Sequence, residues 1–253
     1  MTHIATARLA MLIATAVTQP IAFAAPPRGA EVAQAEIQIG LCAPPDQIVR
    51  ALELRPRGTP INVWQFDDAA LTLYGRGLRL RLRVAVDGRS VLTLKVANQD
   101  CAQLDHKWVP PDEGKCEYDV YGASTAGAVS LNRSLSAKST SDLLAGRLAL
   151  AKALSPVQLG YLREVAGMWP LPPGIRELGP AQVQTYQTKG KLYDIDMSQL
   201  PNGKNYAEIS RKVPRADATR TMIAMEADLA RAGVEKCADQ SSQIADKLRS
   251  LLH

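Results

Sequence analysis

Strict alternation of leucine and arginine in one short segment is the feature that most constrains the fold of this chain. Residues 77–95 read GLRLRLRVAVDGRSVLTLK, so Arg79, Arg81 and Arg83 stand two positions apart. Successive side chains of a β-strand point to opposite faces, which predicts one arginine face and one leucine face. The alternative is an ordinary half-buried strand whose arginines only face water, because such a strand shows the same alternation.

The same segment predicts a β-hairpin. Asp87 and Gly88 supply a tight turn, and residues 91–95 return as a second strand. Alternation along that strand puts Lys95 on the arginine face, so four cations would line one surface. The planar, forked guanidinium group of arginine suits phosphate or carboxylate groups.

The first 24 residues are predicted to be a signal peptide. Arg8 gives a positive region, residues 9–17 form an apolar core, and residues 22–24 (AFA) form a small-x-small cleavage site. The mature chain, 25–253, would be a single domain that is periplasmic or secreted. A retained N-terminal anchor is the alternative. No other stretch approaches the roughly 20 apolar residues that a membrane span needs, so no span is expected after cleavage.

An even number of cysteines is expected to form disulfides in an exported chain. The four are Cys42, Cys101, Cys116 and Cys237, and no two of them make a C-x-x-C pair. They allow three pairings. Pairing Cys101 with Cys116 would close a short loop and leave Cys42 for Cys237, but the choice among the three depends on geometry.

Charge and motifs exclude several classes of function. The net charge of +5 suits anionic ligands but is too low for a nucleic-acid-binding protein, so no nucleic-acid partner is expected. The sequence has no G-x-S-x-G elbow, no P-loop and no dinucleotide fingerprint. His106 and His253 cannot build a histidine-rich zinc site, and His106 is expected on a surface loop. The sequence defines no oligomeric state.

The order of predicted elements indicates an α+β fold. Strands are expected at 35–41, at 61–77 with a turn near Asp67, in the arginine hairpin, at 115–122, at 183–197 and at 205–213. Helices are expected after an N-cap at Asp46, at 139–167, at 216–233 and at 238–252, with a proline-rich connector at 169–180.

Acidic and basic residues alternate along several of these strands. Besides the arginine row they are Glu36, Lys115, Glu117, Asp119, Asp194, Asp196 and Glu208. Such groups are costly to bury unless they pair or bind ions. Facing rows inside a barrel would hold a divalent cation and a polyphosphate together, the acids on the cation and the bases on the phosphate oxygens. On an ordinary half-exposed sheet the same residues would face solvent.

The order of these motifs resembles the CYTH superfamily, the triphosphate tunnel metalloenzymes that include class IV adenylate cyclases, thiamine triphosphatases and inorganic triphosphatases. The similar stretches are EIQIG at 36–40, FDDAAL at 66–71, LRLR at 78–81, TLK at 93–95, KCEYD at 115–119, LYDID at 192–196 and YAEIS at 206–210. They span nearly all of the mature chain.

This resemblance implies an antiparallel β-barrel that forms a tunnel with flanking helices. It implies phosphate-binding roles for Arg79, Arg81, Arg83, Lys95 and Lys115. It also implies metal-binding roles for Glu36, Glu117, Asp119 and Glu208, with Mg²⁺ or Mn²⁺ as a weakly held cofactor.

The sequence departs from the family pattern mainly in its acidic residues. Gln38 and Gly40 stand where the pattern has a glutamate and a lysine, and Ser210 replaces a late glutamate. A site with fewer carboxylates holds a hard cation more weakly. We therefore predict an exported protein that binds a phosphorylated small molecule or polyphosphate, with weak or no catalysis. The alternatives are a metal-dependent triphosphatase acting on inorganic or organic triphosphates, and a structural or partner-binding domain without a ligand.

Overall fold

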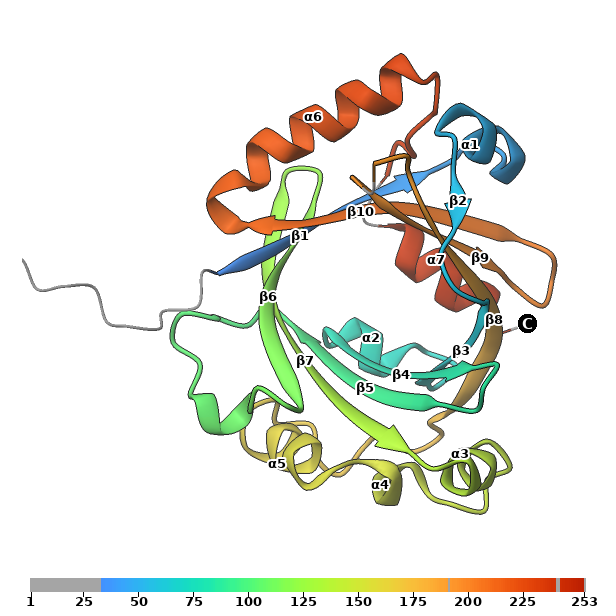
Figure 1. Ribbon diagram of the computed structural model, residues 1–253. Helices are drawn as coiled ribbons and strands as arrows, with labels where there is room; N and C mark the ends of the chain where they lie inside the picture. The colour runs from blue at the N-terminus through green and yellow to red at the C-terminus, as the bar shows by residue number, and fades with distance from the viewer. Residues whose placement is uncertain (1–32, 191, 240–241, 253) are drawn as a thin grey trace, which may run out of the picture. The chain divides into compact units, whose positions relative to one another are not determined.

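The described part of the chain is built around a β-barrel (Figure 1). The computed structural model describes residues 33–190, 192–239 and 242–252, so the predicted signal peptide at 1–24 lies outside the described residues. The strands are β1 (Gln34–Leu41), β2 (Arg55–Pro56), β3 (Ile61–Asp67), β4 (Leu78–Ala85), β5 (Ser90–Ala97), β6 (Gly114–Tyr121), β7 (Ser124–Leu135), β8 (Arg176–Gln187), β9 (Asp194–Gln199) and β10 (Asn205–Pro214).

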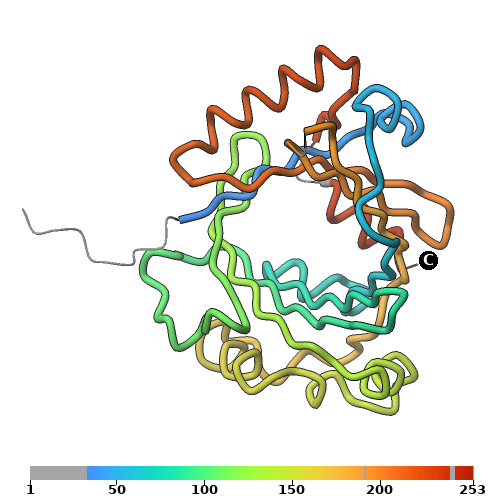
Figure 2. Tube along the Cα trace, viewed as in Figure 1, coloured from blue at the N-terminus to red at the C-terminus, as the bar shows by residue number. Residues whose placement is uncertain are grey.

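Nine of these strands close into a ring. Their order is β8-β3-β4-β5-β7-β6-β1-β10-β9, and the ring closes because β9 pairs with β8 as well as with β10. β2 pairs with the end of β8. Figure 2 shows how the first strand and the late strand β10, far apart in sequence, run side by side. The α+β barrel with flanking helices is therefore confirmed.

The helices are α1 (Pro45–Ala51), α2 (Thr72–Gly75), α3 (Ala137–Leu144), α4 (Leu150–Ala153), α5 (Pro156–Glu164), α6 (Ala218–Arg231) and α7 (Ser242–Ser250). α3, α4 and α5 cover the barrel on the side of β5 and β7, and α6 covers it on the side of β1 and β10 (Figure 1). α7 contributes side chains to the barrel's interior. None of the helices in the described part is both long enough and apolar enough to cross a membrane.

The arginine hairpin has the predicted register. Arg79 lies opposite Lys95, and Arg81 lies opposite Thr93. Leu80 is fully buried in the hydrophobic layer between the barrel and α5, together with its leucine neighbours on β4. The arginines point the other way and line the interior cavity, so the leucine face and the arginine face are divided as the alternation predicts.

Some details differ from the sequence predictions. β1 and β6 are parallel, so the barrel is mixed instead of purely antiparallel; the long crossover between them makes this pairing possible. Pro44, not Asp46, is the N-cap of α1, and Asp46 lies in the first turn, where it pairs with Arg50 at 2.7 Å. The last part of the expected connector, residues 176–180, belongs to β8, and residues 176–178 pair with β3.

The two aspartates at the end of β3, Asp67 and Asp68, have a structural role. The buried carboxylate of Asp67 accepts hydrogen bonds from the backbone N–H groups of Asp68, Leu73 and Tyr74. Asp68 accepts from the N–H and the hydroxyl of Thr72. These bonds satisfy the otherwise unpaired donors at the start of α2. The FDDAAL stretch therefore fixes the turn that leads into β4.

Both disulfides of the favoured pairing are present. Cys101–Cys116 spans 15 residues and closes the loop before β6. Cys42–Cys237 spans 195 residues and joins the end of β1 to the segment between α6 and α7. His106 is exposed in a short 3₁₀ turn of the first of these loops, as expected.

Candidate ligand-binding site

The barrel encloses a polar cavity of about 750 Å³, a volume typical of small-molecule sites. Among the described residues, its basic lining side chains are Arg79, Arg81, Arg83, Lys95, Lys115, Lys212 and Lys247. Its acidic lining side chains are Glu36, Asp112, Glu117, Asp196 and Glu208. The structure thus brings most of the predicted site residues together around one space.

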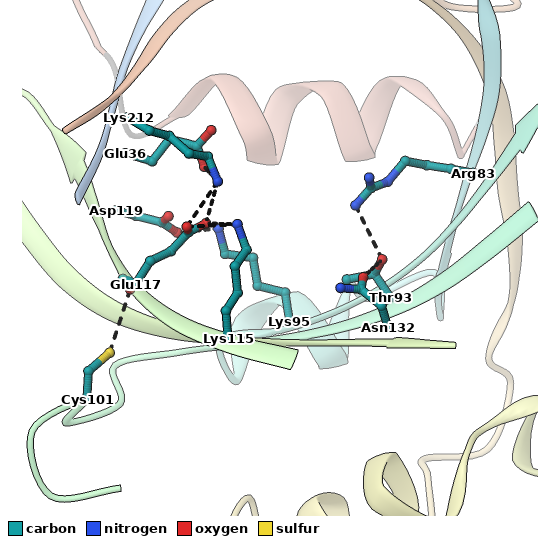
Figure 3. Close-up of polar contacts among 10 residues, drawn as sticks. All are labelled: Glu36, Arg83, Thr93, Lys95, Cys101, Lys115, Glu117, Asp119, Asn132 and Lys212. Atoms are coloured by element: carbon teal, nitrogen blue, oxygen red, sulfur yellow. Dashed lines mark hydrogen bonds and ion pairs between the residues drawn. The ribbon is translucent and has the colours of Figure 1, made fainter. Parts of the chain in front are cut away.

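The three arginines of β4 lack carboxylate partners. No ion pair within the described residues joins Arg79, Arg81 or Arg83 to an acid. Arg83 donates to the hydroxyl of Thr93 at 3.3 Å, whereas its buried Nε has no hydrogen-bond partner (Figure 3). Burial and the charges of the two other arginines lower the pKa of Arg81 to about 9. A bound anion would relieve this repulsion and supply the missing acceptors.

Across the cavity from Arg83 lies a second group of charges, which we call the acid–lysine cluster (Figure 3). It consists of Glu36, Lys95, Lys115, Glu117, Asp119 and Lys212. The carboxylates of its three acids lie within 4.8 Å of one another. Lys95 Nζ lies 2.5 Å from Asp119 Oδ2, and Lys115 Nζ lies 2.7 Å from Glu117.

The lysines decide the electrostatics of this cluster. Burial alone would raise the pKa of Glu117, but the ammonium groups of Lys115 and Lys212 outweigh burial and lower that pKa. Burial disfavours the charged form of Lys212, but the carboxylates of Glu36 and Glu117 outweigh burial and raise the pKa of Lys212. Each acid of the cluster therefore has a lysine as its counterion.

The cluster fits a divalent cation poorly in this arrangement. Three nearby carboxylates are suitable donors, and Asp119 Oδ1 is buried without a hydrogen-bond partner. Against this, lysine ammonium groups contact both oxygens of Glu117 and the second oxygen of Asp119. Mg²⁺ or Mn²⁺ would have to displace these lysines before it could bind.

Glu208 lies apart from the three clustered acids. It faces Gly40 on β1 and Asp196 on β9 across the strand pairs. Burial raises the pKa of Glu208 to about 7, with help from Asp196 and against the opposing effect of Lys247. Lys247 projects from α7 and donates to Ser198 at 2.6 Å.

This buried carboxyl is expected to make folding stability fall as pH rises. Below its ordinary pKa of 4.5, Glu208 is protonated in both states and its contribution is fully present. Between 4.5 and about 7 the unfolded chain releases the proton while the folded barrel keeps it. The free energy of unfolding should then drop by about 2 to 3 kcal/mol.

Urea unfolding measured from pH 4 to pH 8 would detect this slope. Glu208→Gln should flatten it, whereas Glu53→Gln, at an exposed carboxylate, should leave it unchanged. An equal slope in wild type and Glu208→Gln would show that this carboxyl is not responsible.

The structure explains the two residues of β1, Gln38 and Gly40, that depart from the family pattern. Gln38 is buried in the cavity wall opposite Ser210. At Gly40 an added Cβ would lie 2.0 Å from Oε1 of Gln243, so a side chain of α7 fills the space that a larger residue would occupy. The cavity is thus completed by the last helix at this position.

The lining residues that do not follow from the family resemblance include Lys212, Gln243 and Lys247. Lys212 could have been predicted from the sequence, because it follows Glu208 and Ser210 at intervals of two residues and therefore lies on the same face of the strand. Gln243 and Lys247 reach the cavity only because α7 packs at the barrel, which no local pattern specifies.

Comparisons with known proteins agree on the fold. No protein-family model matches the sequence, and no curated protein is similar to it. A candidate adenylyl cyclase from Hippeastrum, described as having a dominant triphosphatase activity, is 15% identical with a TM-score of 0.56, over 83% of this chain and 92% of that one. A candidate adenylate cyclase from Bacillus halodurans is 12% identical with a TM-score of 0.55, over 83% and 97%. Together with the closed barrel, these similarities show a CYTH-like fold.

Proposed function

We propose that the barrel binds the phosphate groups of a phosphorylated small molecule or a polyphosphate. The observation that carries the proposal is the row of Arg79, Arg81 and Arg83, which faces the cavity and makes no ion pair with a carboxylate of the described residues. Guanidinium groups bind phosphate oxygens with two parallel hydrogen bonds. The triphosphatase activity in the description of the Hippeastrum protein supports a ligand of this class.

The lysines of the cavity have different roles in this proposal. Lys95 and Lys115 contact acids, so we assign them a supporting role at the edge of the phosphate site. Lys247 lies in the same cavity and interacts electrostatically with Arg79 and Arg81. It therefore becomes an additional phosphate-binding candidate, supplied by α7.

Arg81→Gln should weaken binding of tripolyphosphate by about 1 to 3 kcal/mol, which is roughly 5- to 150-fold, because a charge-assisted hydrogen bond is lost. Isothermal titration calorimetry measures this directly. The control is Arg89→Gln, since Arg89 belongs to the same hairpin but is exposed and pairs with Asp87. Equal affinities of wild type and Arg81→Gln, or no binding by the wild type, would contradict the proposal.

We propose that catalysis is weak or absent. Neutral Gln38 and Ser210 lie where the family pattern has carboxylates, and lysines hold Glu117 and Asp119. Too few carboxylates are then left to bind a divalent cation. Without that cation, the negative charge that develops during phosphoryl transfer is not stabilised.

A metal-dependent triphosphatase is the second candidate. Two observations favour it: three carboxylates lie close together, and Asp119 Oδ1 lacks a partner. Release of phosphate from tripolyphosphate in the presence of Mn²⁺ tests it. Turnover of about 1 per second or faster, lost in Glu117→Gln, would establish the enzyme in place of the binding protein.

We also propose that the protein is exported to the periplasm or secreted. The two disulfides support this, since disulfides persist in oxidising compartments. N-terminal sequencing of the mature protein tests cleavage after residue 24, and an intact N-terminus would contradict it.

A further inference from the structure

We propose that Lys212 is a built-in cation that takes the place of a divalent metal, so that the cavity binds its anionic ligand without a metal ion. The inference rests on the proposed phosphate-binding function and extends it to the cofactor requirement. It concerns the acid–lysine cluster, the place where the family resemblance implies a metal.

The ammonium group of Lys212 bridges two acids. Its Nζ lies 3.0 Å and 3.2 Å from the two oxygens of Glu117 and 3.9 Å from Oε2 of Glu36. Figure 3 shows the group between these carboxylates, above Lys115. A single positive charge thus lies where a cation shared by Glu36 and Glu117 would be held.

Backbone pairing places Lys212 there. Residue 212 on β10 lies opposite Glu36 on β1, and Glu36 lies opposite Asp119 on β6. Every second residue of β10 faces the cavity, which puts Lys212 on the same wall as Glu208. The contact is therefore fixed by the register of three neighbouring strands, and no loop has to move to form it.

Charge balance argues against a metal in addition to this lysine. The three acids of the cluster are matched by Lys95, Lys115 and Lys212. A divalent ion would add two positive charges to a neutral cluster, in a cavity whose three arginines make no ion pair with any described carboxylate. At separations of 3 to 4 Å, like charges inside a protein repel strongly. The arginines, in contrast, remain available for phosphate.

The test is titration of Mn²⁺ alone into wild type, Lys212→Met and Lys138→Met. Methionine keeps the unbranched shape and most of the length of the side chain and removes its charge. Lys138 lies on α3 outside the cavity and makes an exposed ion pair, so its variant controls for loss of a surface lysine. We expect Mn²⁺ to bind Lys212→Met about tenfold or more tightly than wild type or the control, because Glu36 loses its lysine partner and Glu117 keeps only Lys115 of its two. In the wild type, tripolyphosphate should bind equally with EDTA and with Mn²⁺.

Micromolar binding of Mn²⁺ by the wild type, or unchanged Mn²⁺ affinity in a folded Lys212→Met, would overturn the inference. If thermal melting shows that the variant does not fold, the two wild-type titrations still decide. Tight Mn²⁺ binding, or tripolyphosphate binding that depends on Mn²⁺, overturns the inference. Weak Mn²⁺ binding together with tripolyphosphate binding that is independent of Mn²⁺ supports it. A wild type that binds no tripolyphosphate contradicts the proposed function, while the Mn²⁺ comparison still tests the role of Lys212.

Discussion

Leu80→Asp should abolish folding. Leu80 is fully buried at the centre of the layer between β4 and the helices that cover it. A carboxylate introduced there would have no cation to pair with, because the arginines lie on the opposite face of the strand. Burying an unpaired charge costs at least about 5 kcal/mol, which equals the whole stability of many domains.

Circular dichroism and size-exclusion chromatography would show the loss of structure. The control is Val86→Asp. Val86 is the first residue of the turn after β4, its side chain is 77% exposed, and the same substitution should be tolerated there. A folded Leu80→Asp protein would mean that the leucine and arginine faces are assigned the wrong way round.

The hairpin could be predicted because side chains alternate between the two faces of a strand. On a strand, a shift by one position exchanges the two faces, so regular alternation specifies both the element and its orientation. The same rule identifies β1 and β10. It fails for β7, whose sequence STAGAVSLNRSL mixes small and polar residues on both faces. There the constraint is tertiary: a Cβ on Gly127 would lie 2.0 Å from the carbonyl oxygen of Gln99.

Strand order is harder to derive than strand identity. β1 lies between β6 and β10, parallel to one and antiparallel to the other. Nothing within residues 34–41 specifies these partners, because the choice depends on how the whole sheet closes. The motif order of a known family carries that information, and for this reason the resemblance predicts the barrel where local patterns do not.

Some features of the candidate site could likewise be predicted from the sequence, and others depend on how the strands assemble. The arginine row follows from spacing within one strand, and its place in the cavity agrees with the prediction. The partner of Lys95 could not be predicted, since Asp119 lies on β6 and β7 separates that strand from β5. Lys115 instead pairs with Glu117, two residues further along its own strand. Whether a cluster of acids holds a metal or a lysine depends on such cross-strand distances, which alternation alone does not contain.

Removal of the Cys42–Cys237 disulfide should lower the free energy of unfolding by about 5 kcal/mol. This bond closes a loop of 195 residues, so it removes many conformations from the unfolded chain. It also holds the end of β1 beside the segment that leads into α7, and α7 supplies Lys247 to the cavity wall. A double variant, Cys42→Ser with Cys237→Ser, measured by guanidinium unfolding, gives the loss.

The second disulfide provides the matched control. Cys101–Cys116 spans only 15 residues, and the chain-entropy argument gives about 3 kcal/mol for a loop of that length. Serine replacement of the long-range pair should therefore cost about 2 kcal/mol more than serine replacement of the short-range pair. Equal losses would mean that native-state packing around the two bonds outweighs loop entropy, because loop length is the property in which they differ most. A larger loss from the short-range pair would instead place the weak point of the barrel at the loop that precedes β6, next to the acid–lysine cluster.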